Sequence, residues 1–234
     1  MHWLIALAPM LLLAAGCSDE PKRTLAPPAE SEYFANSSPD SVIANLVIAL
    51  ESMDSLGYAA LLYDGSELAT DGITYAPYKF YYDRSVNPDL PELDLYDREL
   101  ERMGAMLGGA PGEDGYGNTV PGVRGFYLDL AAPTPDWAAP IGPDVDDDAY
   151  PVGTAWRVYD TSILITLKSN YGTDTNAWSI SDRLLAHCIP VQVGGETEYR
   201  LWKWREIVGA KRAVPRPGIV ESVSLGSIKA LYGG

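Results

Sequence analysis

The chain has 234 residues, of which 47% are hydrophobic, and a formal net charge of −15 at pH 7. This length and composition indicate a folded protein with a real apolar core. The charge argues against a nucleic-acid partner, because a polyanion would be repelled, and against adhesion to anionic lipid headgroups.

An apolar run near the beginning of the chain ends in small residues and a cysteine. Trp3–Leu13 is too short to span a bilayer, which needs ~20 apolar residues, but it suits the core of a signal peptide. The segment LLLAAGC, Leu11–Cys17, resembles the lipobox of bacterial lipoproteins. The resemblance implies that residues 1–16 are a signal peptide, that Cys17 is acylated, and that the lipid anchors the protein to a membrane. An ordinary secretory signal or a short buried helix is the alternative.

The residue after the cysteine bears on the location of the anchored protein. In well-studied lipoproteins, an Asp directly after the acylated cysteine favours retention in the inner membrane. This chain has Ser18 at that position. We therefore expect a cell-envelope protein, lipid-anchored at the outer membrane and facing the periplasm. Residues 17–37 are polar and contain prolines, which predicts a flexible tether.

Two helices are expected at the beginning of a folded domain over residues 38–212. The first follows Ser38-Pro39-Asp40, a combination typical of helix starts, and its apolar spacing continues to about Met53. The second begins at Asp54 or Ser55 and ends near Gly65. Together they predict a helical hairpin.

A strand, a third helix and two long loops are expected next. Tyr78–Tyr82 is aromatic enough for a strand. A helix capped by Asp94 is predicted to run to about Leu107. A loop rich in Gly and Pro follows at 108–122 and a loop rich in Pro and Asp at 131–151, with a strand between them at Val123–Leu130.

The rest of the chain is rich in strands joined by short turns, which predicts antiparallel pairing. A short helix is expected in the C-terminal extension, residues 213–234. Helices first and strands later indicate an α+β protein. The predicted strands are Trp156–Tyr159, Ser162–Leu167, Leu184–Val193 and Glu198–Val208.

The order of these elements resembles the nuclear transport factor 2-like superfamily, which includes SnoaL-like cyclases. The residues that carry the likeness are Ser38–Leu46 (SPDSVIANL), Met53–Leu62 (MDSLGYAALL) and Tyr199–Glu206 (YRLWKWRE). The resemblance implies helices packed on a strongly curved antiparallel sheet, forming a cone with an apolar pocket at its open end. It does not decide between catalysis, ligand binding and protein contacts.

Enzymes of that superfamily commonly use an Asp or an Asp-His pair inside the cone as a general base. By this resemblance His187 is the catalytic candidate, with Asp129 as its acidic partner. A buried histidine that is hydrogen-bonded within the core is the alternative to catalysis.

Aromatic residues near these positions give a candidate ligand-binding set. Trp202 and Trp204 are expected on one strand face, where they could wall a pocket together with His187 and Tyr127. Core packing is the alternative for the tryptophans.

No metal or cofactor is expected. The aspartate-rich run 144–148 has Ala149 where a calcium loop needs Gly and Ala155 where it needs Glu. With Cys17 acylated, Cys188 has no partner for an intrachain disulfide and is expected to be a buried hydrophobe.

The sequence thus favours a lipid-anchored envelope protein whose non-catalytic domain binds a small apolar ligand or a protein partner. A cyclase, isomerase or hydrolase that acts through His187 is the first alternative, and a structural envelope component is the second. A homodimer is a further possibility.

Overall fold

The computed structural model describes residues 33–85, 88–142, 149–172, 175–207, 219–221 and 224–233. The predicted signal peptide, Cys17 and the aspartate-rich run lie outside these residues. The described elements combine helices with a large, mainly antiparallel sheet, which confirms the α+β class. None of the helices in these ranges is long and apolar enough to cross a membrane.

The first two helices begin where the sequence predicts. Helix α1 spans Pro39–Glu51, and Ser38 forms a capping box with Ser41 at its start. Helix α2 spans Ser55–Leu61, and the carboxylate of Asp54 accepts two backbone N–H groups at its start.

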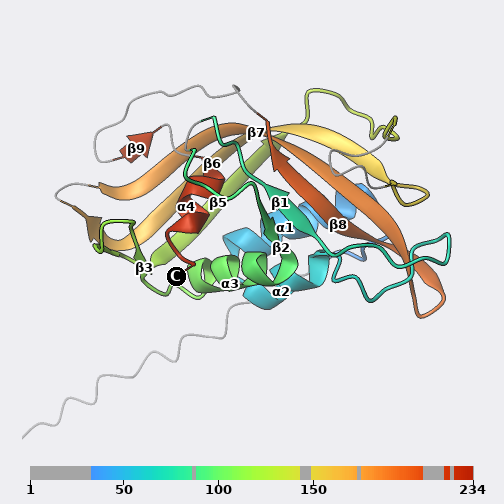
Figure 1. Cartoon of the computed structure of the whole chain (residues 1–234), viewed down its shortest axis with the longest axis horizontal. Coiled ribbons are helices and arrows are strands. Elements are labelled where there is room, and N and C mark those ends of the chain that lie inside the picture. The colour runs from blue at the N-terminus through green and yellow to red at the C-terminus, as the bar shows by residue number, and fades with distance from the viewer. Residues whose placement is uncertain are drawn as a thin grey trace, which may run out of the picture. The chain divides into compact units, whose positions relative to one another are not determined.

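The large sheet has the strand order β2-β1-β8-β7-β6-β5, with β9 pairing to β7 (Figure 1). Strands β5 to β8 pair antiparallel, whereas β1 is parallel to β8 and β9 is parallel to β7. A separate hairpin joins β3 to β4. The strand bounds are β1 Lys79–Tyr81, β2 Leu93–Leu95, β3 Gly112–Glu113, β4 Thr119–Val120, β5 Val123–Ala131, β6 Ala155–Tyr171, β7 Thr175–Val193, β8 Glu196–Glu206 and β9 Ile219–Glu221.

The two strands predicted on either side of Asp160-Thr161 are one 17-residue strand, β6. The prediction was wrong because these polar residues have partners across the sheet. Asp160 pairs with the guanidinium of Arg183, and the Thr161 hydroxyl donates to the carbonyl of Asp182. Strand β7 likewise begins well before the predicted Leu184.

Helix α3 spans Tyr96–Leu107, and Asp94 is not its cap. Leu95 occupies the N-cap position without a side-chain hydrogen bond. Asp94 lies in β2, almost fully buried, and its carboxylate is 2.7 Å from Nη1 of Arg102. A buried carboxylate needs a compensating charge, so the ion pair takes precedence over the predicted cap.

The main core lies where α1, α2 and α3 meet the sheet and helix α4, Leu225–Ala230. Helix α4 contacts α3 although the two are far apart in sequence (Figure 1). Cys188 belongs to this core, and burial raises the pKa of its thiol well above the usual range. A second, smaller cluster contains Tyr63, Ile189, Val191 and Trp202.

Candidate functional site

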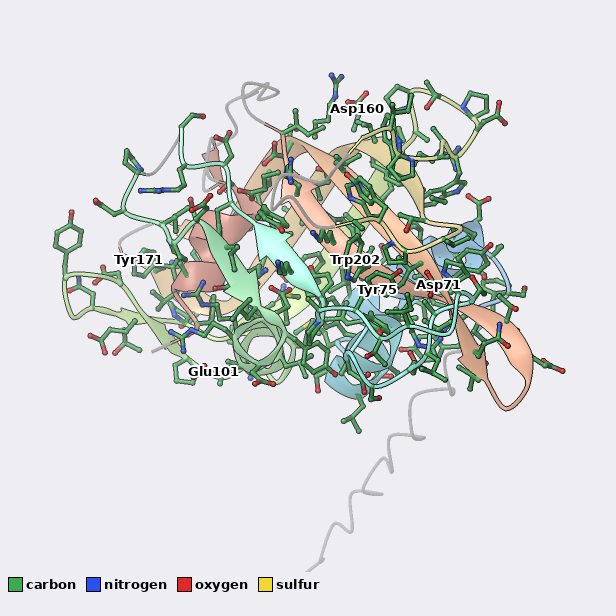
Figure 2. The ribbon with its side chains drawn as sticks, turned by 45° about the vertical axis from the view of Figure 1, so that its right-hand side comes forward. Asp71, Tyr75, Glu101, Asp160, Tyr171 and Trp202 are labelled. Carbon is green, nitrogen blue, oxygen red and sulfur yellow. The ribbon has the colours of Figure 1, made fainter. Side chains whose placement is uncertain are left out.

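His187 and Trp202 lie in the region of the second cluster, away from the main core. The ring of Tyr150 stacks on His187 at 5.6 Å between centroids and meets Trp202 edge-on at 6.0 Å. Figure 2 shows Trp202 beside Tyr75, in the part of the structure where Asp71 also lies. Since side chains alternate along a strand, His187 faces away from the core that contains its neighbours in β7.

The prediction that Trp202 and Trp204 share a strand face is wrong. The β7–β8 ladder pairs His187 with Lys203 but Cys188 with Leu201, so Trp202 is an extra residue at a β-bulge. The bulge shifts the alternation by one residue. Trp204 therefore belongs to the main core and Trp202 to the second cluster.

Asp129 and Tyr127 do not join His187. Both side chains are exposed on β5, opposite in direction to the buried Phe126 and Leu128. The pairing register places Asp129 opposite Ser162, which is opposite Ser181 of β7. Ser181 is roughly 20 Å from His187 along the strand, at ~3.4 Å per residue. The predicted acid–base pair is therefore not assembled.

The main core contains a cavity that the sequence analysis did not locate. The cavity offers about 20 Å³ to bound water, which is enough for one or two molecules. Four of its lining residues carry a polar group: Tyr58, Tyr78, Glu99 and Trp204. The other lining residues are apolar: Leu46, Leu50, Phe80, Met103, Phe126, Leu128, Ile163, Leu184 and Leu225.

Two hydrogen-bond donors at this cavity have no partner. The hydroxyl of Tyr78 and the indole Nε1 of Trp204 are buried, and neither makes a hydrogen bond of regular geometry within the described residues. The hydroxyls of Tyr78 and Tyr58 are nevertheless close enough for each to shift the pKa of the other. Leaving such a group unsatisfied costs ~1–3 kcal/mol, so native structures rarely contain them. Both residues line the cavity, so an acceptor bound there is a candidate partner for these donors.

Glu99 contributes a carboxylate whose two oxygens are both occupied. The Tyr58 hydroxyl donates to Oε1 at 2.5 Å, and Nζ of Lys229 donates to Oε2. Glu99 and Lys229 are almost completely buried. Nζ of Lys229 also lies 3.3 Å from the ring centroid of Phe80. The ion pair connects α3 to α4 behind the cavity wall.

More buried charges lie near this pair. Asp94 accepts hydrogen bonds from Arg102 and from the hydroxyl of Tyr82. Glu206 accepts from the backbone N–H groups of Asp83 and Gly226, both at 2.8 Å. The apolar cavity is thus backed by a polar network that anchors α4.

Burial sets the protonation of the cavity groups. Desolvation raises the pKa of Tyr58 and of Tyr78 well above 10.0, and the nearby Glu99 charge adds to both shifts. Desolvation lowers the pKa of Lys229, while the attraction of Glu99 opposes that shift. Both tyrosines are therefore neutral donors over the physiological range.

Sequence reasoning missed Glu99 and Lys229 because nothing local distinguishes them from solvated helix residues. The helical spacing of the apolar residues predicts a buried face through Tyr96, Leu100, Met103 and Leu107, but the first two are only partly buried. The buried face is displaced toward Glu99, which the sequence gives no reason to bury. No group of three or more His, Cys, Asp or Glu residues in the described ranges is arranged to hold a metal ion.

The sequence matches no protein-family model and no curated protein. Several solved structures are similar in fold. A nuclear transport factor 2-like protein from Salmonella enterica has 14% identity over 74% of this chain and 89% of its own, with a TM-score of 0.44.

Two further similar structures are a protein of unknown function and an enzyme. A protein of unknown function from Mycobacterium tuberculosis has 12% identity over 83% of this chain and 82% of its own, with a TM-score of 0.40. A hexachlorocyclohexane dehydrochlorinase from Novosphingobium barchaimii has 12% identity over 74% of this chain and 90% of its own, with a TM-score of 0.33.

Proposed function

We propose that this protein is a binding protein whose main-core cavity holds a small, mainly apolar molecule with one hydrogen-bond acceptor. The observation that carries the proposal is the pair of unpartnered donors, Tyr78 and Trp204, on an otherwise apolar wall. A carbonyl oxygen has two lone pairs and can accept from both. Binding sites of this type combine apolar walls with a few polar groups that fix orientation.

The cavity is water-sized in the described conformation, so a ligand has to displace side chains as well as water. Met103 is suited to this movement, because its unbranched side chain adapts easily to new shapes. The ligand class is therefore compact and cyclic or branched, with a ketone, aldehyde or ester oxygen.

Binding is favoured over catalysis because the carboxylate at the cavity is already engaged. Tyr58 and Lys229 already donate to the two oxygens of Glu99, which fixes the carboxylate in place and leaves one lone pair on each oxygen for a bound molecule. An isomerase or hydrolase with Glu99 as its base is the second candidate, because Glu99 lines the same cavity. This replaces the predicted role of His187, which faces the second cluster.

A matched pair of probes tests the proposal. Cyclohexanone and cyclohexane differ by one acceptor, and we expect the full chain in mild detergent to prefer the ketone. Tyr78→Phe should weaken ketone binding about tenfold, as expected for one lost hydrogen bond, and leave cyclohexane binding unchanged. Tyr127→Phe is the control, because that hydroxyl is on an exposed side chain. Equal binding of both probes, or no effect of Tyr78→Phe, would overturn the proposal.

We further propose that the chain is a lipoprotein of the cell envelope, anchored through Cys17, and that its domain belongs to the nuclear transport factor 2-like superfamily. The support for the anchor is the LLLAAGC segment, and the support for the superfamily is the order helix pair, strand, helix and antiparallel strands. Mass spectrometry of the membrane-extracted protein should find residues 1–16 removed and acyl chains on Cys17. A bare thiol with the leader attached would contradict the anchor.

A further inference from the structure

A second hollow opens on the surface where the β6–β7 ladder is interrupted. The pairing is regular as far as Thr166, opposite Ala177, and resumes only at Tyr171, opposite Thr175. The residues between these pairs leave the β6–β7 ladder and, together with Arg124 of β5, line a hollow of about 210 Å³. Its polar lining comes from Arg124, Thr166, Lys168, Ser169, Asn170 and Asn176.

The chemistry of this hollow contrasts with that of the chain. The chain carries a net charge of −15, yet the described lining has two cations, two hydroxyls and two carboxamides, and no carboxylate. All of these groups can donate hydrogen bonds. The lining is thus complementary to an oxyanion.

Arg124 has no partner among the described residues. It is the bulge residue of β5, because the register shifts between Val123 and Gly125, and its side chain is exposed. Every other arginine in the described ranges contacts a carbonyl, a carboxylate or an aromatic ring: Arg84, Arg98, Arg102, Arg157, Arg183, Arg200 and Arg205. Among the described residues, no group engages its guanidinium.

Lys168 is held in position at the hollow. Its Nζ donates to the carbonyl of Gly109 at 2.6 Å. A Cβ on Gly109 would lie 2.4 Å from that Nζ, and the positive φ of 64° at this residue also favours glycine. No other contact of this ammonium group is found in the described part of the chain, and its remaining two N–H bonds can donate to another acceptor.

We propose that this hollow binds a phosphate-type oxyanion, with Arg124 as a two-pronged donor and Lys168 as a fixed point charge. A guanidinium fits two oxygens of a phosphate at once, and an ammonium group complements it as a compact charge. The acidic surface of the chain repels anions at long range, but salt screens that repulsion beyond ~10 Å at 0.1 M. Binding therefore depends on these short contacts.

The phosphate group could be free or part of a lipid headgroup, so the test has two arms. The full chain in a nonionic detergent is titrated calorimetrically with inorganic phosphate and, separately, with short-chain phosphatidic acid. If inorganic phosphate and phosphatidic acid both bind saturably, the proposal is supported and the hollow accepts phosphate whether it is free or esterified. If phosphatidic acid alone binds, the proposal is supported and the bound phosphate is that of a lipid headgroup.

Three variants decide whether this hollow is responsible. Arg124→Gln and Lys168→Gln should each weaken binding about tenfold, as expected for the loss of one charge-assisted hydrogen bond. Arg183→Gln removes a charge elsewhere on the sheet and should leave the affinity unchanged. The proposal is overturned if neither ligand binds saturably, if Arg124→Gln has no effect, or if Arg183→Gln weakens binding as much.

Discussion

Two fully buried tyrosines at the same cavity have opposite hydrogen-bonding states. The Tyr58 hydroxyl donates to Glu99, whereas the Tyr78 hydroxyl makes no hydrogen bond of regular geometry among the described residues. A buried hydroxyl stabilises the folded state only if it donates to an acceptor. Replacing tyrosine by phenylalanine should therefore have opposite effects on stability at the two positions.

Tyr58→Phe should destabilise the protein by about 1–3 kcal/mol, because it removes a hydrogen bond to a buried carboxylate. Tyr78→Phe should be neutral or stabilising by up to about 1 kcal/mol, because it removes an unsatisfied group. Urea unfolding of the two variants and the parent chain measures the difference. Equal losses at both positions would contradict the assignment of partners.

The buried ion pair predicts strong coupling between α3 and α4. Glu99→Gln or Lys229→Met alone should cost about 3–5 kcal/mol, because each leaves a charge buried without its partner. The double variant should cost clearly less than the sum of the two. Additive losses in the same denaturation assay would show that the two groups do not interact.

Single residues explain why the sequence predicted parts of the site and missed others. Asp94 has the spacing of a helix cap, and no local signal reveals that Arg102 takes its carboxylate instead. Trp202 and Trp204 follow the period of a strand, but a bulge invisible in the sequence separates them. The prediction that Cys188 is a buried hydrophobe is confirmed, since it needs only local composition.

At the scale of elements, helix α4 completes the cavity wall and depends on close packing. It contributes Leu225 to the cavity and Lys229 to the ion pair. Its second residue, Gly226, is pressed against Tyr82, where an added Cβ would lie 2.2 Å from a ring carbon. This approach leaves no room for any other residue.

Gly226→Ala should therefore destabilise the protein by about 1–3 kcal/mol through overpacking. Gly104→Ala in α3 is the matched control, since nothing lies within 4 Å of its added Cβ. The control should be stabilising by about 0.5–1 kcal/mol, because alanine favours a helix interior. Thermal unfolding compares the two, and a stable Gly226→Ala variant would refute the close packing of α4.

Elements with strong local signals were predicted well. The start of α1, both ends of β1 to within about one residue and the position of α4 follow from caps, aromatic content and apolar spacing. The short strands β2, β3, β4 and β9 were not predicted. They have two or three residues each and exist through pairing with distant segments rather than through local preference.

At the scale of the whole molecule, buried tyrosines make stability sensitive to high pH. Burial raises the pKa of Tyr58 and Tyr78 well above 10.0 and that of Tyr159 to about 12. Above pH 10 the unfolded chain loses tyrosine protons that the folded chain keeps, so this stability is present below pH 10 and is lost as the pH rises. The lowered pKa of Lys229 acts in the opposite direction, but it concerns one group.

The unfolding midpoint in urea should therefore fall between about pH 8 and about pH 11, and tyrosinate absorbance should rise together with unfolding. A midpoint that stays constant, with tyrosines titrating in the folded protein, would show that these side chains are accessible to solvent.

We propose above that Tyr78 and Trp204 donate to a ligand oxygen inside the main core. The most direct measurement is a crystal structure of the full chain grown with saturating cyclohexanone. We expect the ketone oxygen within hydrogen-bond distance of Tyr78 Oη and Trp204 Nε1, with Met103 displaced. A cavity that holds only water, with cyclohexanone elsewhere or absent, would contradict it.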